Sequence, residues 1–146
     1  MDDLQLKDLV DAHKEWIIGL RRKLHRIPED GFKEFKTQRA IMDALDDIGV
    51  PYETERTWVI AMIEGAYPGD TVAIRADMDA LPLTEPEGCL FRSEHEGMMH
   101  ACGHDAHVAM ALGAAKVLNC LRDQLHGRSN SCSSPLRKAS VVPNPW

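Results

Sequence analysis

The densest group of potentially reactive side chains lies in one short segment, His100–His107, whose sequence is HACGHDAH. The segment holds histidine, cysteine and aspartate, and these are side chains that bind transition metals. Cys102 and His104 are separated only by Gly103, and glycine permits the tight turn that would direct both side chains at one point. The spacing therefore makes Cys102 and His104 the first candidates for metal ligands.

Two other interpretations of this segment stay open on the residues alone. A cysteine with a histidine partner can act as a nucleophile, and either residue can also be an ordinary packing or surface residue. We interpret the isolated histidines and cysteines elsewhere as ordinary residues: His13, His95, His126, Cys89 and Cys120. A hydrolytic metal site would need further ligands besides Cys102 and His104, and a general base.

Two aspartates could reach the same site from a neighbouring element. Asp77 and Asp79 follow Thr71–Ala76, a nearly continuous apolar run that predicts a buried strand. In open α/β sheets, sites form at the carboxyl ends of strands, close to the start of the following helices. A helix N-terminus also favours anions, which would favour a thiolate at Cys102. We therefore expect Asp77 and Asp79 to lie near Cys102 and His104.

Helices and strands alternate around these candidate residues. Apolar residues at helical spacing predict three helices, over about 4–26, 34–48 and 105–121. Gly49 is the expected C-cap of the second helix. Thr57–Glu64 has the β-branched and apolar composition of a strand, whereas Ala66–Asp70 has the composition of a turn. This alternation is typical of an α/β fold.

The composition excludes several classes of protein. Of the 146 residues, 44% are hydrophobic and 27% are charged, as in a soluble globular protein. No apolar run reaches the roughly 18 residues that a membrane helix needs, and the acidic start does not resemble a secretory signal. The net charge of −6 argues against nucleic acid as the main partner. Four cysteines do not suggest a secreted disulfide framework, so we expect a reducing, cytoplasmic location.

The composition changes after Gly127. The segment Arg128–Trp146 is rich in serine and proline, contains no acidic residue and shows neither helical nor strand periodicity. Such a composition predicts a disordered tail. We therefore divide the chain into residues 1–127, which carry the candidate site, and residues 128–146.

Three segments of the chain resemble one known family, in the same order and at similar intervals. They are RRKLHRIPEDGFKEFKT (Arg21–Thr37), VAIRADMDALPLTE (Val72–Glu85) and GMMHACGHDAHVAMALGAAKVL (Gly97–Leu118). These segments are similar to the N-terminal part of the metal-dependent amidohydrolases and carboxypeptidases. That family includes hippurate hydrolase, N-acyl-amino-acid amidohydrolases and indoleacetyl–amino acid hydrolases. The resemblance extends from about Leu9 to Gly127.

The resemblance implies a fold, a reaction and a set of site residues. The fold would be the N-terminal portion of a zinc-exopeptidase-like α/β catalytic domain, with an incomplete sheet and flanking helices. The reaction would be hydrolysis of the amide bond of N-acyl-amino acids or short peptides by two divalent metal ions, which are Mn, Zn, Ni or Co. The family's first two metal ligands fall on Cys102 and His104, Asp79 is a supporting acid, and Asp77 and Asp105 lie around the ligands. Complete members can form homodimers, and neither nucleic acid nor membrane is an expected partner.

The family's next segment is missing from the chain. It carries an acidic pair, roughly QPAEEG, whose first glutamate is the general base and whose second binds a metal. Arg128–Trp146 can be back-translated with codons that, read two bases later, encode VKLMFQPAEEGFGGAKPM. This peptide is similar to the missing segment. We therefore expect that one base was lost near the codons for Gly127 and Arg128, so that residues 128–146 are out of frame.

Two functions from different classes follow from this interpretation. The first is a metal-dependent amidohydrolase or metallopeptidase whose truncated chain is inactive by itself, because the general-base glutamate is absent. The alternative is a non-catalytic fragment with at most a weak Cys/His metal site, since catalytic metal sites usually take three ligands from the protein. A small regulatory module based on a metal or a thiol has less support. An unfinished sheet would also leave a strand edge and apolar helix faces exposed, which favours aggregation.

Overall fold

The computed structural model describes residues 3–134 of the protein, as helices packed on one sheet. Its elements, in chain order, are α1 (Asp3–His25), α2 (Phe35–Ile48), β1 (Tyr52–Glu55), β2 (Trp58–Glu64), β3 (Tyr67–Asp77), α3 (His104–Cys120), a short 3-10 helix (Arg122–Gln124) and β4 (His126–Ser134). The strands form a mixed sheet in the order β1-β2-β4-β3, in which β4 is antiparallel to β2 and parallel to β3. The predicted α/β class is confirmed.

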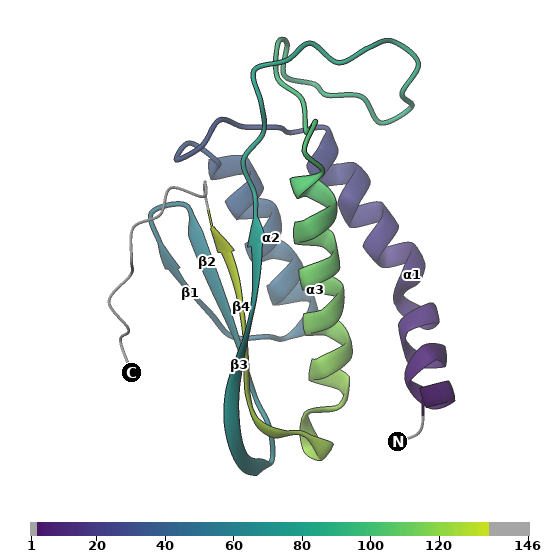
Figure 1. Ribbon diagram of the computed structural model, residues 1–146, viewed down its shortest axis with the longest axis vertical. Helices are drawn as coiled ribbons and strands as arrows, with labels where there is room; N and C mark the ends of the chain where they lie inside the picture. Colours follow the sequence, from purple (N-terminus) through teal and green to yellow (C-terminus); the bar gives the residue numbers. More distant parts are fainter. Residues whose placement is uncertain (1–2, 135–146) are drawn as a thin grey trace.

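The three helices lie on the same side of the sheet (Figure 1). α2 and α3 pack on the strands, whereas α1 packs against α3. All three lie where the apolar periodicity predicts helices, and Gly49 ends α2 in the left-handed conformation with φ 67°. None of the helices within residues 3–134 has the length and apolar character needed to cross a lipid bilayer.

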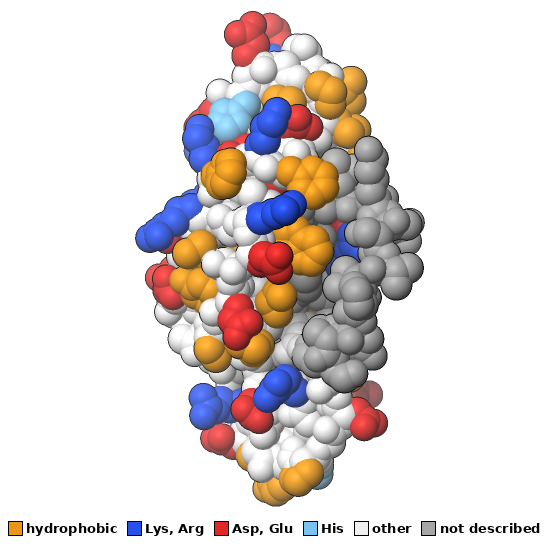
Figure 2. Space-filling model, turned by 90° about the vertical axis from the view of Figure 1, so that its left-hand side faces the viewer, with side chains coloured by type: hydrophobic (Ala, Val, Ile, Leu, Met, Phe, Trp, Pro, Cys, Tyr) orange, Lys and Arg blue, Asp and Glu red, His pale blue; other side chains and the backbone are white. Residues whose placement is uncertain are grey.

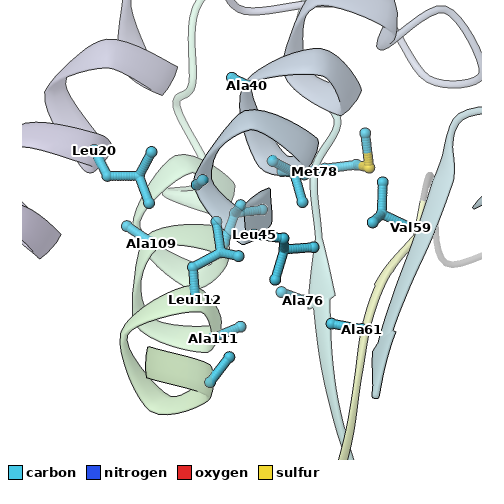
Figure 3. Close-up of a cluster of buried hydrophobic side chains, with 14 of the residues drawn as sticks. Leu20, Ala40, Leu45, Val59, Ala61, Ala76, Met78, Ala109, Ala111 and Leu112 are labelled. Carbon is cyan, nitrogen blue, oxygen red and sulfur yellow. The ribbon is translucent and has the colours of Figure 1, made fainter. Parts of the chain in front are cut away.

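The hydrophobic core fills the space between the sheet and the helices (Figure 3). Leu20 of α1, Leu45 of α2 and Leu112 of α3 point into it from the helices, and Val59 and Ala61 of β2 point into it from the sheet. Alternate residues of β2 are buried, as expected for a strand with one face on the core. Figure 2 shows the side that lies at the left of Figure 1, where hydrophobic side chains are interspersed with charged ones.

Strand β3 differs from the prediction in two ways. It begins at Tyr67, so the turn predicted for Ala66–Asp70 is wrong. The predicted burial of Thr71–Ala76 is also wrong, since Val72 is 62% exposed and Ala76 is the buried residue of this run. The reason is the position of β3 at the edge of the sheet, where β4 is its partner among the described strands.

Strand β4 includes the first part of the predicted disordered tail. Its backbone pairs with β2 from Arg128 to Ser133 and with β3 as far as Ser134. The expectation that no regular element follows Gly127 is therefore wrong for Arg128–Ser134, and residues 135–146 lie outside the described part. Composition does not predict this strand, because polar side chains such as Asn130 and Ser131 occupy its buried positions. Backbone hydrogen bonds to the neighbouring strands hold it in the sheet instead.

Candidate metal centre

His104 and Asp79 meet where β3 ends and α3 begins. His104 is the first residue of α3, and Gly103 precedes it in the left-handed conformation with φ 77°. The His104 ring nitrogen Nδ1 lies 2.9 Å from the Asp79 carbonyl oxygen and 3.2 Å from Asp79 Oδ1. The structure thus brings together one strand-end aspartate and one candidate ligand, as the sequence predicts.

The contacts of His104 determine which ring atom can bind a metal. Both oxygens of Asp79 that face Nδ1 are hydrogen-bond acceptors, so the proton of a neutral ring lies on Nδ1. The lone pair is then on Nε2. Histidines that bind metals in proteins usually donate a hydrogen bond from their other ring nitrogen to an oxygen, as Nδ1 does here. Asp79 is 7% exposed, and its buried Oδ1 has no other hydrogen-bond partner. An imidazole whose Nδ1 is held by Asp79 in this way fits a divalent cation at Nε2.

Cys102 is exposed in the turn that leads into α3. A thiolate and an imidazole are suitable ligands for zinc and similar cations. Within residues 3–134, however, Cys102 and His104 do not join a third His, Cys, Asp or Glu in a group of ligand atoms close enough to hold an ion. Cys102 and His104 therefore stay candidate ligands by residue type and spacing alone.

Asp77 and Asp105 have other partners. The Asp77 carboxylate accepts two hydrogen bonds from the Arg75 guanidinium, at 2.9 and 3.1 Å. Asp105 is buried, and its Oδ2 lies 2.7 Å from His25 Nδ1 and 2.9 Å from Arg21 Nε. Their role around a bound metal stays a prediction.

His100 is buried close to the candidate site and carries no charge at neutral pH. Burial lowers the pKa of His100 to about 4. Nearby Asp105 acts to raise this pKa, and repulsion from His25 acts to lower it. Neither ring nitrogen has a hydrogen-bond partner. His100 is thus a neutral interior residue in the described structure.

Sequence reasoning missed two buried groups. Glu34 is fully buried, and this burial raises its pKa, although hydrogen bonding from the surrounding backbone and from Thr57 offsets part of the effect. His25 is held between two carboxylates, Asp105 and Glu85. The available signal was the resemblance itself, because His25, Glu34 and Glu85 all lie inside the family-like segments.

Comparisons with known proteins agree with the resemblance. Residues 73–131 match the model of peptidase family M20/M25/M40. The chain is 45% identical over 126 residues to thermostable carboxypeptidase 1 of Saccharolobus solfataricus. The aligned region covers 84% of this chain and 32% of the relative. It is 47% identical over 126 residues to the N-acyl-L-amino acid amidohydrolase of Geobacillus stearothermophilus. That alignment covers 84% of this chain and 34% of the amidohydrolase.

A solved structure gives the same result. A dinuclear metal-binding peptidase of the M20 family from Bacillus subtilis superimposes with a TM-score of 0.82 at 39% identity, over 86% of this chain and 36% of the other. The chain thus spans about one third of the length of the relatives that it matches. Together with the order of the three motifs, these matches identify the chain as the counterpart of the N-terminal part of the M20 family of metallopeptidases and amidohydrolases.

Proposed function

We propose that the protein derives from a metal-dependent hydrolase that cleaves the amide bond of N-acyl-amino acids or short peptides. The observation that carries this proposal is the contact between His104 Nδ1 and Asp79, at 2.9 Å to the carbonyl and 3.2 Å to the carboxylate. This contact leaves Nε2 available to bind a metal at the start of α3, two residues after Cys102. The names of the relatives, a carboxypeptidase and an amidohydrolase, support the type of reaction.

The residues of this chain would have distinct roles. Cys102 and His104 would hold the metal, and Asp79 would fix the ring of His104. Divalent ions bound there, of which the family-like pattern implies two, would supply a polarised substrate carbonyl and an activated water. Burial of Asp79 keeps water from competing for its contact with His104, so that the ligand is oriented before binding.

We further propose that the 146-residue chain is inactive by itself. The family-like segment with its general-base glutamate lies in the shifted reading frame, and two ligands leave a catalytic site incomplete. The polar side chains at buried positions of β4, Asn130, Ser131 and Ser133, support an out-of-frame origin for this strand, because the shifted frame encodes a more apolar peptide there. The cheapest check is the nucleotide sequence from the Cys120 codon past the stop, which should encode QPAEEG in the second frame.

The activity test compares the chain with a version whose frame is restored. We expect hippurate and N-acetyl-amino acids to be hydrolysed by the restored protein with added manganese, and not by the 146-residue chain. The Cys102→Ala variant of the restored protein should lose activity. Turnover by the 146-residue chain that scales with manganese and disappears in Cys102→Ala would contradict the proposed inactivity. A folded, metal-loaded restored protein without activity would contradict the proposed reaction.

A further inference from the structure

A second group of ligand-type side chains includes neither Cys102 nor His104. His25 at the end of α1 and Glu85 and Cys89 in the loop between β3 and α3 each direct one ligand atom to a common point, and these atoms lie within 4.8 Å of one another. His25 and Glu85 are buried, and Cys89 is half-buried. Such a set is rare in an interior, because polar side chains usually enter it in pairs that satisfy each other.

The contacts of His25 leave a place for a cation. Its Nδ1 lies 2.7 Å from Asp105 Oδ2, and its Nε2 lies 3.0 Å from Glu85 Oε1. A neutral ring that donates from Nδ1 to Asp105 turns the lone pair of Nε2 toward a carboxylate oxygen, and two lone pairs repel. A positive charge between Nε2 and Glu85 removes this repulsion, whether it is a second proton on the ring or a bound metal.

The surroundings favour the metal. A carboxylate that holds the distal nitrogen of a ligating histidine, as Asp105 holds His25, is the usual support of a zinc site. The second oxygen of Glu85 is fixed by the Ser93 amide at 2.6 Å, which orients Oε1 toward His25. The Cys89 thiol, which hydrogen-bonds to Glu85, adds a third ligand atom at the same point.

We propose that His25, Glu85 and Cys89 form a metal site for zinc or a similarly thiophilic divalent cation, separate from the site of Cys102 and His104. Nitrogen, oxygen and thiolate ligands together favour zinc over magnesium or calcium. Zinc bonds of about 2.0–2.3 Å hold such donors roughly 3–4 Å apart, so the three atoms need to move together by only a small amount. A free coordination position is left for water.

The position of this site assigns it a structural role. The segment between β3 and α3 has little regular structure, and it is tied to the end of α1 by single hydrogen bonds such as Glu94 N to Arg26 O at 2.8 Å. An ion shared by His25, Glu85 and Cys89 would fasten this segment to α1. Because Asp105 contacts His25 and adjoins His104, the ion would also steady the start of α3.

The test uses cobalt, whose bond to a thiolate gives a charge-transfer absorption. The reduced 146-residue chain carrying Cys102→Ala should show this absorption with Co²⁺, and zinc should displace the cobalt. Adding Cys89→Ala should abolish the absorption and weaken binding at least about tenfold. Adding Cys120→Ala instead, at an exposed cysteine at the end of α3, should change neither.

Two results would overturn the proposal. The first is a folded Cys102→Ala chain that shows no thiolate absorption with cobalt, which would leave His25 as a doubly protonated ring between two carboxylates. The second is an absorption that persists without Cys89. If Cys89→Ala alters the circular dichroism spectrum, Cys89→Ser takes its place, and zinc should raise the Tm of the Cys102→Ala chain but not that of the double variant. The proposal does not depend on hydrolytic activity and can fail or hold separately from it.

Discussion

The carboxyl group of Glu34 is buried, with backbone amides, Thr57 and Asp79 around it. Burial disfavours its charged form and raises its pKa above the ordinary 4.5. The folded protein therefore binds this proton more tightly than the unfolded chain does. Between pH 4.5 and the raised pKa the folded state carries more protons, so the free energy of unfolding falls as the pH rises through this range.

Replacing Glu34 by glutamine should remove this pH dependence. We expect Glu34→Gln and the unchanged chain to have similar stability near pH 4.5, and the variant to be more stable at neutral pH, by about 1.4 kcal/mol for each unit by which the pKa is raised. Urea unfolding from pH 4.5 to neutral measures the difference. Glu55→Gln, an exposed position of β1, is the control and should show no such effect. A variant that is less stable at neutral pH would mean that the structure uses Glu34 in its charged form.

At the scale of elements, β4 combines a central place in the sheet with polar side chains. Ser131 and Ser133 face Leu45, Val59 and Leu112 across a small cavity of about 10 Å³. A cavity of this size holds at most about one water molecule, and its lining lacks part of the packing that a filled core would provide. With the lost base restored, the shifted reading frame would place leucine at position 131, which is an apolar residue suited to this position.

Filling the cavity should stabilise the protein. Ser131→Val adds two buried carbon atoms, each worth about 0.8 kcal/mol, and part of this gain is lost to crowding, so we expect a net gain of roughly 1 kcal/mol in the free energy of unfolding. Ser131→Ala removes the hydroxyl without filling the space and should change the stability less. Denaturant unfolding of both variants distinguishes the two contributions. A loss of stability in Ser131→Val would show that the strand cannot accept an apolar side chain there.

The close approach of β3 and β4 depends on Gly127. This residue has φ 79°, and a Cβ atom would overlap the carbonyl oxygen of Asp70. Gly127→Ala should therefore cost about 1–2 kcal/mol for the left-handed backbone and roughly 1–3 kcal/mol more for the clash. Gly49→Ala is the matched control, because Gly49 has φ 67° with no atom within 4 Å of the added Cβ, and it should show only the first cost. Equal losses in urea unfolding would contradict this close approach.

The helices could be predicted from the sequence, whereas two strands could not. Each helix has apolar residues at a period that only a helix explains, and Gly49 marks an end. β1 is short and mostly exposed, and β4 carries polar residues, so neither has an apolar pattern. Both are held by backbone pairing with strands from other parts of the chain, which composition does not reveal.

The candidate site was predicted in the same uneven way. His104 and Asp79 meet because a strand end and a helix start share one edge of the sheet, which is a rule that applies from the sequence. Asp105 faces His25 instead, and Glu85 joins His25 from the loop before α3. Such contacts depend on how the loop folds back on α1, for which local sequence carries no rule.

At the scale of the whole molecule, α1 is the outermost layer. It lies on the far side of α3 from the sheet (Figure 1), and its buried residues are Leu20, Leu24 and His25, all in its second half. The first half is mostly exposed, and Trp16 and Ile17, just past the middle of the helix, are partly buried. α3, in contrast, is buried between α1 and the sheet. Because buried apolar contacts set the cost of local opening, the two helices should differ in protection.

Hydrogen exchange measured by mass spectrometry should therefore show a gradient across the layers. We expect amides of residues 3–16 to exchange by local opening and those of α3 only on global unfolding. Gly113→Ala sharpens the test, because the added Cβ would lie 2.6 Å from Ile17 Cδ1 and must displace it. This change should speed exchange throughout α1 and leave β2 protected, since β2 contacts α2, α3 and the neighbouring strands rather than α1. Equal acceleration in α1 and β2 would mean that the layers unfold as one unit, and that α1 is as integral to the core as the sheet.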